Sequence, residues 1–122
     1  MKTIIKIMSV QFDRDVLLLN AESNINIAGL KPKEQILVDP DHLSFIYLMD
    51  YENEYTYISI ADFIWSELKQ ALECQSSVFL NIQESRILLP NFLEELTYLI
   101  ENIIGNANYG EQMVDKVEQI FR

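Results

Sequence analysis

The stretch NFLEELTYLIENIIG, residues 91–105, decides the helical part of the fold. Asn91 and Glu94 have the three-residue spacing of an N-terminal capping pair, and Gly105 supplies a C-terminal stop. Between these signals, apolar side chains recur at helical spacing: Phe92, Leu93, Leu96, Leu99, Ile100, Ile103 and Ile104. The pattern predicts an amphipathic helix with one face against a core.

A second helix follows a short loop. Asn108 and Glu111 repeat the capping spacing ahead of an apolar stripe at Met113, Val114, Val117, Ile120 and Phe121. With so short a connection, the two C-terminal helices are expected to form a helical hairpin.

An earlier helix is predicted from Ser59 onward, where Ser59 and Asp62 resemble an N-terminal cap. Its apolar stripe is Ile60, Phe63, Ile64, Leu68, Ala71 and Leu72. Trp65 and, on the 91–105 helix, Tyr98 are expected to be partly buried. Residues 77–82 and 86–89 then form a hairpin around Gln83, Glu84 and Ser85.

The first half of the chain favours strands. Strands are predicted at 3–12, 16–21, 25–28, 35–39, 43–49 and 55–60, with a break in the chain at 29–32. Because side chains alternate between the faces of a strand, Phe45, Tyr47 and Met49 should share one face, as should Thr56, Ile58 and Ile60. Together with the helices, this predicts a single α+β domain over residues 1–122. Its sheet should be mainly antiparallel, with about six to eight short strands, one inserted helix and a C-terminal helix pair.

Composition limits the classes of partner. Of 122 residues, 49% are hydrophobic and 23% charged, and nine basic against nineteen acidic residues give a net charge of −10. Such a charge repels phosphate backbones and anionic lipids, so neither nucleic acid nor a membrane is expected as a partner. No apolar stretch is long enough for a transmembrane helix, and with Cys74 as the only cysteine a cytoplasmic location is predicted.

Candidates for catalysis are few. His42 is the only histidine, so nucleophilic catalysis that needs an imidazole must use it. The turn Asp39, Asp41 and His42 has ligand types that suit Mn, Mg or Zn, and these residues are the candidate metal ligands. Glu94, Glu95 and Glu101 are explained by helix capping and solvation. No glycine-rich phosphate-binding motif is present, and no cofactor is predicted.

Candidates for binding are aromatic and amide side chains. Tyr51 and Tyr55 belong to a group of tyrosines around the 43–60 hairpin, where they can grip a partner or simply fill a half-buried strand surface. The segment 105–110, GNANYG, adds Asn106, Asn108 and Tyr109, which can either shape the loop or contact a ligand. These five residues are the candidate binding residues.

The chain also resembles a known family. The resemblance rests on Gly29-Leu30, Leu37 to Asp41, Phe45 to Tyr47, Trp65, Glu95 to Ile103, Gly105 to Gly110 and Val117-Glu118. These residues resemble the YjbL-like uncharacterised proteins of low-GC Gram-positive bacteria over nearly the whole chain. The resemblance implies a small cytosolic bacterial protein and assigns no activity, cofactor or partner.

Three functions remain open. The leading hypothesis is a non-enzymatic protein-interaction or regulatory module that binds an unknown protein or a second copy of itself. The alternative is a small metal-dependent hydrolase that uses Asp39, Asp41 and His42. The third is a binder of a small apolar ligand between sheet and helices, because pocket and core residues have the same composition.

Overall fold

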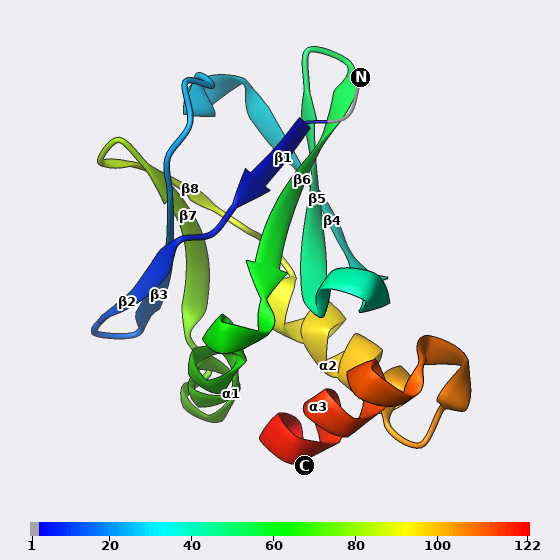
Figure 1. The fold of residues 1–122 in the computed structure, drawn as a ribbon. Helices are drawn as coiled ribbons and strands as arrows, with labels where there is room; N and C mark the ends of the chain where they lie inside the picture. The colour runs from blue at the N-terminus through cyan, green and yellow to red at the C-terminus, as the bar shows by residue number, and fades with distance from the viewer. Residues whose placement is uncertain (1–2) are drawn as a thin grey trace.

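The computed structural model describes residues 3–122 (Figure 1). Its strands are β1 (Thr3–Lys6), β2 (Ser9–Asp13), β3 (Val16–Ala21), β4 (Leu30–Asp39), β5 (Ser44–Tyr51), β6 (Glu54–Ala61), β7 (Ser77–Ile82) and β8 (Ser85–Leu88). Its helices are α1 (Trp65–Cys74), α2 (Phe92–Ile103) and α3 (Glu111–Phe121), with short 3₁₀ helices at Ile27–Gly29, Pro40–His42, Asp62–Ile64 and Ala107–Tyr109. The predicted α+β class, with one inserted helix and a C-terminal helix pair, is confirmed.

The strands form two sheets rather than the single sheet expected. The first sheet has the order β1-β6-β5-β4 and the second the order β2-β3-β7-β8. The pairs β1–β6 and β3–β7 are parallel and the other four are antiparallel, so the predicted antiparallel majority is confirmed. In Figure 1 the helices gather at one end of the two sheets.

The predicted strand at 3–12 is wrong as one element, because the chain changes sheets within it. The backbone N–H of Ile7 donates to Ser59 O of β6 at 3.0 Å, whereas that of Met8 donates to Asn20 O of β3 at 2.8 Å. The uninterrupted run of strand-forming residues conceals this crossing, since both halves are genuine strand.

The predicted strand at 25–28 and the predicted chain break at 29–32 are also wrong. Residues 25–28 do not form a strand; the 3₁₀ helix Ile27–Gly29 begins there, and the side chain of Asn26 accepts a hydrogen bond from Ala28 N at 3.1 Å. The expected break at 29–32 lies within β4, which begins at Leu30 and passes through Pro32. Proline is tolerated because β4 is an edge strand and a bulge follows, between Pro32 and Ile36.

The core lies on the inner face of the first sheet. Phe45, Tyr47 and Met49 are fully buried there, as predicted from their alternation. Phe45 stacks on Trp65 with ring centroids 4.4 Å apart, and Trp65 Nε1 donates to Ile60 O at 3.1 Å. Trp65 is therefore completely buried rather than partly buried.

The first helix begins later than predicted. Ser59 belongs to β6, where it pairs with Ile46, so it is not a helix cap. Sheet pairing continues to Ala61, and a 3₁₀ turn separates it from α1 at Trp65. The turn also removes Phe63 from the apolar stripe and leaves it 64% exposed.

The C-terminal helices agree with prediction in position but not in capping. Asn91 has φ 60° and makes no side-chain cap; its amide donates instead to the Glu34 carboxylate. Asn108 lies inside a 3₁₀ helix, and Gly110 occupies the position before α3. Tyr98, expected to be partly buried, is 68% exposed. None of the helices within residues 3–122 is long and apolar enough to cross a membrane.

Candidate functional site

The outer face of the first sheet is the main candidate surface. Alternation along each strand directs one set of side chains into the core and the other set away from it. The outward set includes two cross-strand rows: Lys6, Ser59, Ile46 and Leu37, and Ile4, Tyr57 and Leu48. We call this surface, with the flanking Met8 and Phe63, the outer face.

None of α1, α2 and α3 contributes a residue to the hollow on the outer face, whereas the 3₁₀ helices at Pro40–His42 and Asp62–Ile64 border it. The hollow is a cavity of about 870 Å³, lined by Ile4, Lys6, Ile7, Met8, Leu37, Val38, Asp39, Pro40, His42, Ser44, Ile46, Tyr57, Ser59, Ala61 and Phe63. Three lining side chains are large, apolar and more than half exposed: Ile4 (51%), Met8 (62%) and Phe63 (64%). Exposed apolar side chains gathered in one hollow are typical of an interaction site.

The predicted metal residues lie at the β4 edge of this face. His42 Nδ1 and Asp39 Oδ2 are 2.9 Å apart, and both residues line the cavity, whereas Asp41 is exposed and is not part of the lining. Among residues 3–122, no three His, Cys, Asp or Glu side chains lie close enough together to hold a metal ion. The structure therefore brings together two of the three candidates, as a hydrogen-bonded pair.

The two candidate tyrosines point to opposite faces. Tyr55 pairs with Asp50 at the end of the β5–β6 hairpin and is 55% exposed on the outward side. Tyr51 is half-buried and packs against the core, with its ring over Gly29. Tyr55 can thus contact a partner on the outer face, and Tyr51 belongs to the inner packing.

The 105–110 segment is tied to both C-terminal helices. The side chain of Asn106 accepts from Asn108 N at 3.1 Å and donates to Asn102 O at 3.2 Å, while Gly105 N donates to Glu118 Oε2 at 2.9 Å. Tyr109 is half-buried against the core and Asn108 is exposed. This segment lies among the helices and does not line the outer-face cavity.

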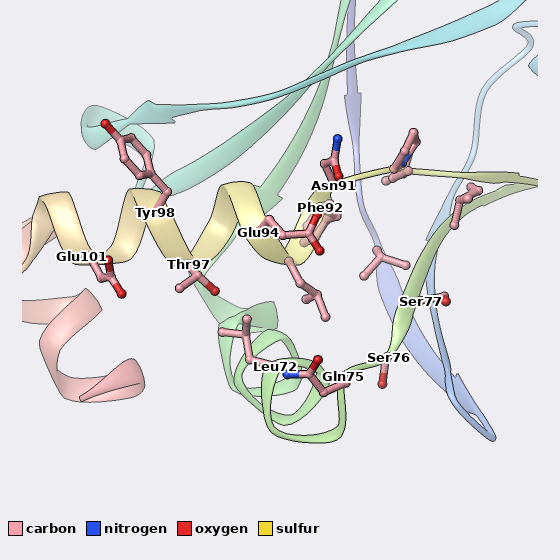
Figure 2. Close-up of a pocket in the computed structure, with 15 residues that line it drawn as sticks. Leu72, Gln75, Ser76, Ser77, Asn91, Phe92, Glu94, Thr97, Tyr98 and Glu101 are labelled. Atoms are coloured by element: carbon pink, nitrogen blue, oxygen red, sulfur yellow. The ribbon is translucent and has the colours of Figure 1, made fainter.

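A second cavity, of about 700 Å³, lies where the end of α1 approaches α2 (Figure 2). Figure 2 shows Leu72 and Gln75 on one side and Thr97 and Glu101 on the other. The hydroxyl of Ser76, in its lining, is buried and has no hydrogen-bond partner within residues 3–122. Two carboxylates, Glu94 and Glu101, are the only charged groups in the lining.

One hydrogen-bonded corner fixes the start of α2 beside this second cavity. Tyr47 donates through its hydroxyl to Pro90 O at 2.8 Å and stacks on Phe92, with ring centroids 5.6 Å apart. Burial raises the pKa of the Tyr47 phenol far above its usual value, and the carboxylates of Glu34 and Glu95 raise it further. Tyr47 therefore acts as a neutral structural donor.

Sequence reasoning missed the residues that make the outer face distinctive. Met8 was placed inside a strand and Phe63 in a buried helix stripe, so neither was a candidate. An available signal was the alternation of β5 and β6, because Ile46, Leu48 and Tyr57 are apolar on the side opposite the core. Ile46 and Leu48 are themselves buried, at 7% exposure each, so the exposed apolar surface of this face lies at Ile4, Met8 and Phe63.

Comparison with known proteins gives full-length matches. A family model described as "Family of unknown function (UPF0738)" matches residues 5–121. UPF0738 protein YjbL of Bacillus subtilis (strain 168) is 40% identical over 121 residues, covering 99% of each chain. A UPF0738 protein of Bacillus cytotoxicus is 38% identical over 122 residues, again with 99% of each chain covered. No solved structure matches significantly.

Proposed function

The chain belongs to UPF0738, a family of unknown function, and from that premise we propose that it is a non-enzymatic protein-interaction module of the bacterial cytoplasm. The proposed binding surface is the outer face. The observation that carries the proposal is the apolar hollow of about 870 Å³ on a four-stranded sheet, where the side chains of Ile4, Met8 and Phe63 are more than half exposed.

The exposed large hydrophobic side chains are concentrated on this face rather than scattered over the molecule. Of the six large hydrophobic side chains that are exposed among the described residues, Ile4, Met8 and Phe63 line the hollow, and Tyr55 lies on the same outward side of the sheet. Isolated exposed hydrophobic residues need no explanation, but a contiguous group on one face supports binding of another protein surface.

The polar side chains on the same face support a catalytic function less well than a binding function. The polar groups are the hydrogen-bonded pair Asp39 and His42 at one edge, Lys6 at the other, and the hydroxyls of Ser44, Ser59 and Tyr57. Asp39, His42 and Ser44 lie together at the β4 edge, but the buried Ser44 hydroxyl donates to the backbone carbonyl of His42 at 3.0 Å rather than to its imidazole. Lys6 lies on the opposite edge strand, β1. The face is suited to recognition through shape and apolar contact.

A site-specific photo-crosslinking experiment tests this proposal. A photoreactive phenylalanine analogue replaces Phe63, and in a matched control it replaces Tyr98, which is also aromatic and similarly exposed (68% against 64%) but lies on α2. Irradiation of living cells should give a discrete protein adduct from position 63 and none from position 98. Adducts from position 98 alone, or equal adducts from both, would contradict the proposal.

A further inference from the structure

We infer that the partner on the outer face is a second copy of this chain, packed sheet on sheet about a two-fold axis that runs parallel to the strands. This inference rests on the proposed function, because it names the occupant of the same face. Three observations carry it: the charge balance of the face, the positions of its two charged groups, and its size.

The outer face is electrically balanced on an acidic protein. Its cavity lining contains one lysine, Lys6, and one aspartate, Asp39, whose charges cancel, whereas the whole chain carries −10 when its single histidine is counted as neutral. A partner attracted by acidic charge would dock elsewhere. A second copy can approach this face without the repulsion that other acidic surfaces would cause.

The two charges stand at opposite edges of the sheet. Lys6 is on edge strand β1, and Asp39 is on edge strand β4. Lys6 lies in the cross-strand row of Leu37, and Asp39 lies two residues further along β4. The offset along the strands is thus about 6.6 Å, which a long, flexible lysine side chain can span. None of the ion pairs within residues 3–122 includes Lys6.

A two-fold axis parallel to the strands places the two oppositely charged edges of the two copies against each other. Rotation about an axis parallel to the strands keeps the position along the strand and exchanges the β1 edge with the β4 edge. Lys6 of each copy therefore faces the Asp39 edge of the other, and the contact occurs twice. Over the central strands, Tyr57 of β6 meets the β5 row of the second copy, where Leu48 is its own cross-strand neighbour.

The face is large enough for a modest dimer. β5 and β6 each have eight residues, so at about 3.3 Å per residue and about 4.8 Å between strands the four-stranded face covers roughly 500 Å². Two copies then cover roughly 1,000 Å² in total, below the roughly 1,200 Å² of stable interfaces and in the range of weak, reversible ones. Ile46 and Leu48 are already buried, so the contact depends mainly on Ile4, Met8 and Phe63. Packing of two sheets with nearly aligned strands is also a common arrangement in β-sandwiches.

Sedimentation equilibrium of the purified full chain, over a micromolar to sub-millimolar concentration series, tests the inference. We expect a reversible monomer–dimer equilibrium. Phe63→Ser should weaken it at least tenfold, and Tyr98→Ser should leave it unchanged. Thermal unfolding of each variant establishes that the fold is intact.

A charge exchange tests the symmetry itself. Lys6→Glu and Asp39→Lys should each weaken the dimer at least fivefold, and the double variant should restore most of the lost affinity. Arg86→Glu on β8 changes the net charge by the same amount as Lys6→Glu, on the other sheet, and should have little effect. Failure of the double variant to recover, or equal effects of Lys6→Glu and Arg86→Glu, would overturn this arrangement.

The outcomes also separate the inference from the proposed function. A monomer at every concentration, with an adduct between position 63 and another protein in cells, overturns the second copy and leaves the interaction module standing. Absence of any adduct at position 63, together with a monomer, overturns both. An adduct between two copies, with the charge exchange behaving as stated, supports both.

Discussion

Tyr47 and Pro90 are joined by a hydrogen bond of 2.8 Å from the phenolic hydroxyl to the backbone carbonyl, across 43 residues of sequence. The bond links the middle of β5 to Pro90, two residues before the start of α2, and the Tyr47 ring also stacks on Phe92. Nearby, the Asn91 amide donates to the Glu34 carboxylate at the β4 bulge. The first sheet thereby fixes the entry of the chain into α2.

Replacement of Tyr47 by phenylalanine should lower the free energy of unfolding by about 0.5–1.5 kcal/mol, because the partly buried Pro90 carbonyl loses its hydrogen-bond donor. Chemical denaturation at neutral pH measures this difference. Tyr98→Phe, which removes the hydroxyl of a 68% exposed tyrosine on α2, is the matched control and should leave stability unchanged. A Tyr47→Phe variant as stable as the parent would show that the hydrogen bond contributes nothing.

The same variant should respond differently to alkaline pH. Burial raises the pKa of the Tyr47 phenol above its unfolded value of 10.0, so the unfolded chain ionises first. The stability that depends on this group is complete below pH 10 and is lost as pH rises toward the folded pKa. The difference in unfolding free energy between parent and Tyr47→Phe should therefore shrink above pH 10. A constant difference up to pH 11.5 would contradict the assigned direction.

Gly29 and Tyr51 provide a test of the inner packing. A Cβ atom on Gly29 would lie 2.8 Å from Cε1 of Tyr51, so the ring must move. We expect Gly29→Ala to cost about 1–3 kcal/mol of unfolding free energy, as overpacked sites do. In a Tyr51→Leu background the same substitution should cost clearly less, because the clashing ring is absent. Equal costs in the two backgrounds would show that Tyr51 does not cover Gly29.

Local patterns predicted the elements whose partners are close in sequence or set by alternation. Phe45, Tyr47 and Met49 alternate into the core as expected, and the hydrophobic stripe of α2 is correctly placed. Predictions that depended on distant contacts were wrong. Asn91 has the spacing of a helix cap, yet its partner is Glu34, 57 residues away.

In the candidate site, too, sequence patterns identified a residue set by local structure and missed those that depend on distant contacts. Tyr55 was found because the hairpin is local, and the structure places it on the outward side of the sheet. Phe63 was missed because an apolar residue at helical spacing predicts burial, whereas here pairing of β6 with β5 continues to Ala61 and the following 3₁₀ turn exposes the ring. The edge-to-edge separation of Lys6 and Asp39 needs the strand order, which the sequence pattern does not contain.

The alternative metal-dependent function predicts that a metal ion binds at Asp39 and His42 and stabilises the fold, whereas the structure predicts no such stabilisation. With only a hydrogen-bonded pair at this edge, and no group of three possible ligands among residues 3–122, we expect millimolar Mg²⁺ or Mn²⁺ or micromolar Zn²⁺ to leave the melting temperature unchanged. Thermal unfolding of the parent and His42→Ala, after chelator treatment, measures this. Stabilisation that disappears in His42→Ala would support the metal hypothesis.

Glu118 should hold the 105–110 segment in place. Its Oε2 accepts from Gly105 N at 2.9 Å and lies 3.7 Å from Nη1 of Arg122, the residue after α3. Because the carboxylate is partly exposed, we expect Glu118→Ala to cost only about 0.5–1.5 kcal/mol of unfolding free energy.

The clearer effect of Glu118→Ala should be local: amide exchange at Gly105 should become at least tenfold faster, since the donor then faces water. Gln119→Ala, exposed on the same helix, should leave both quantities unchanged. Unaltered protection of Gly105 in Glu118→Ala would mean that the segment is ordered by Asn106 alone, whose side chain bridges Asn102 and Asn108.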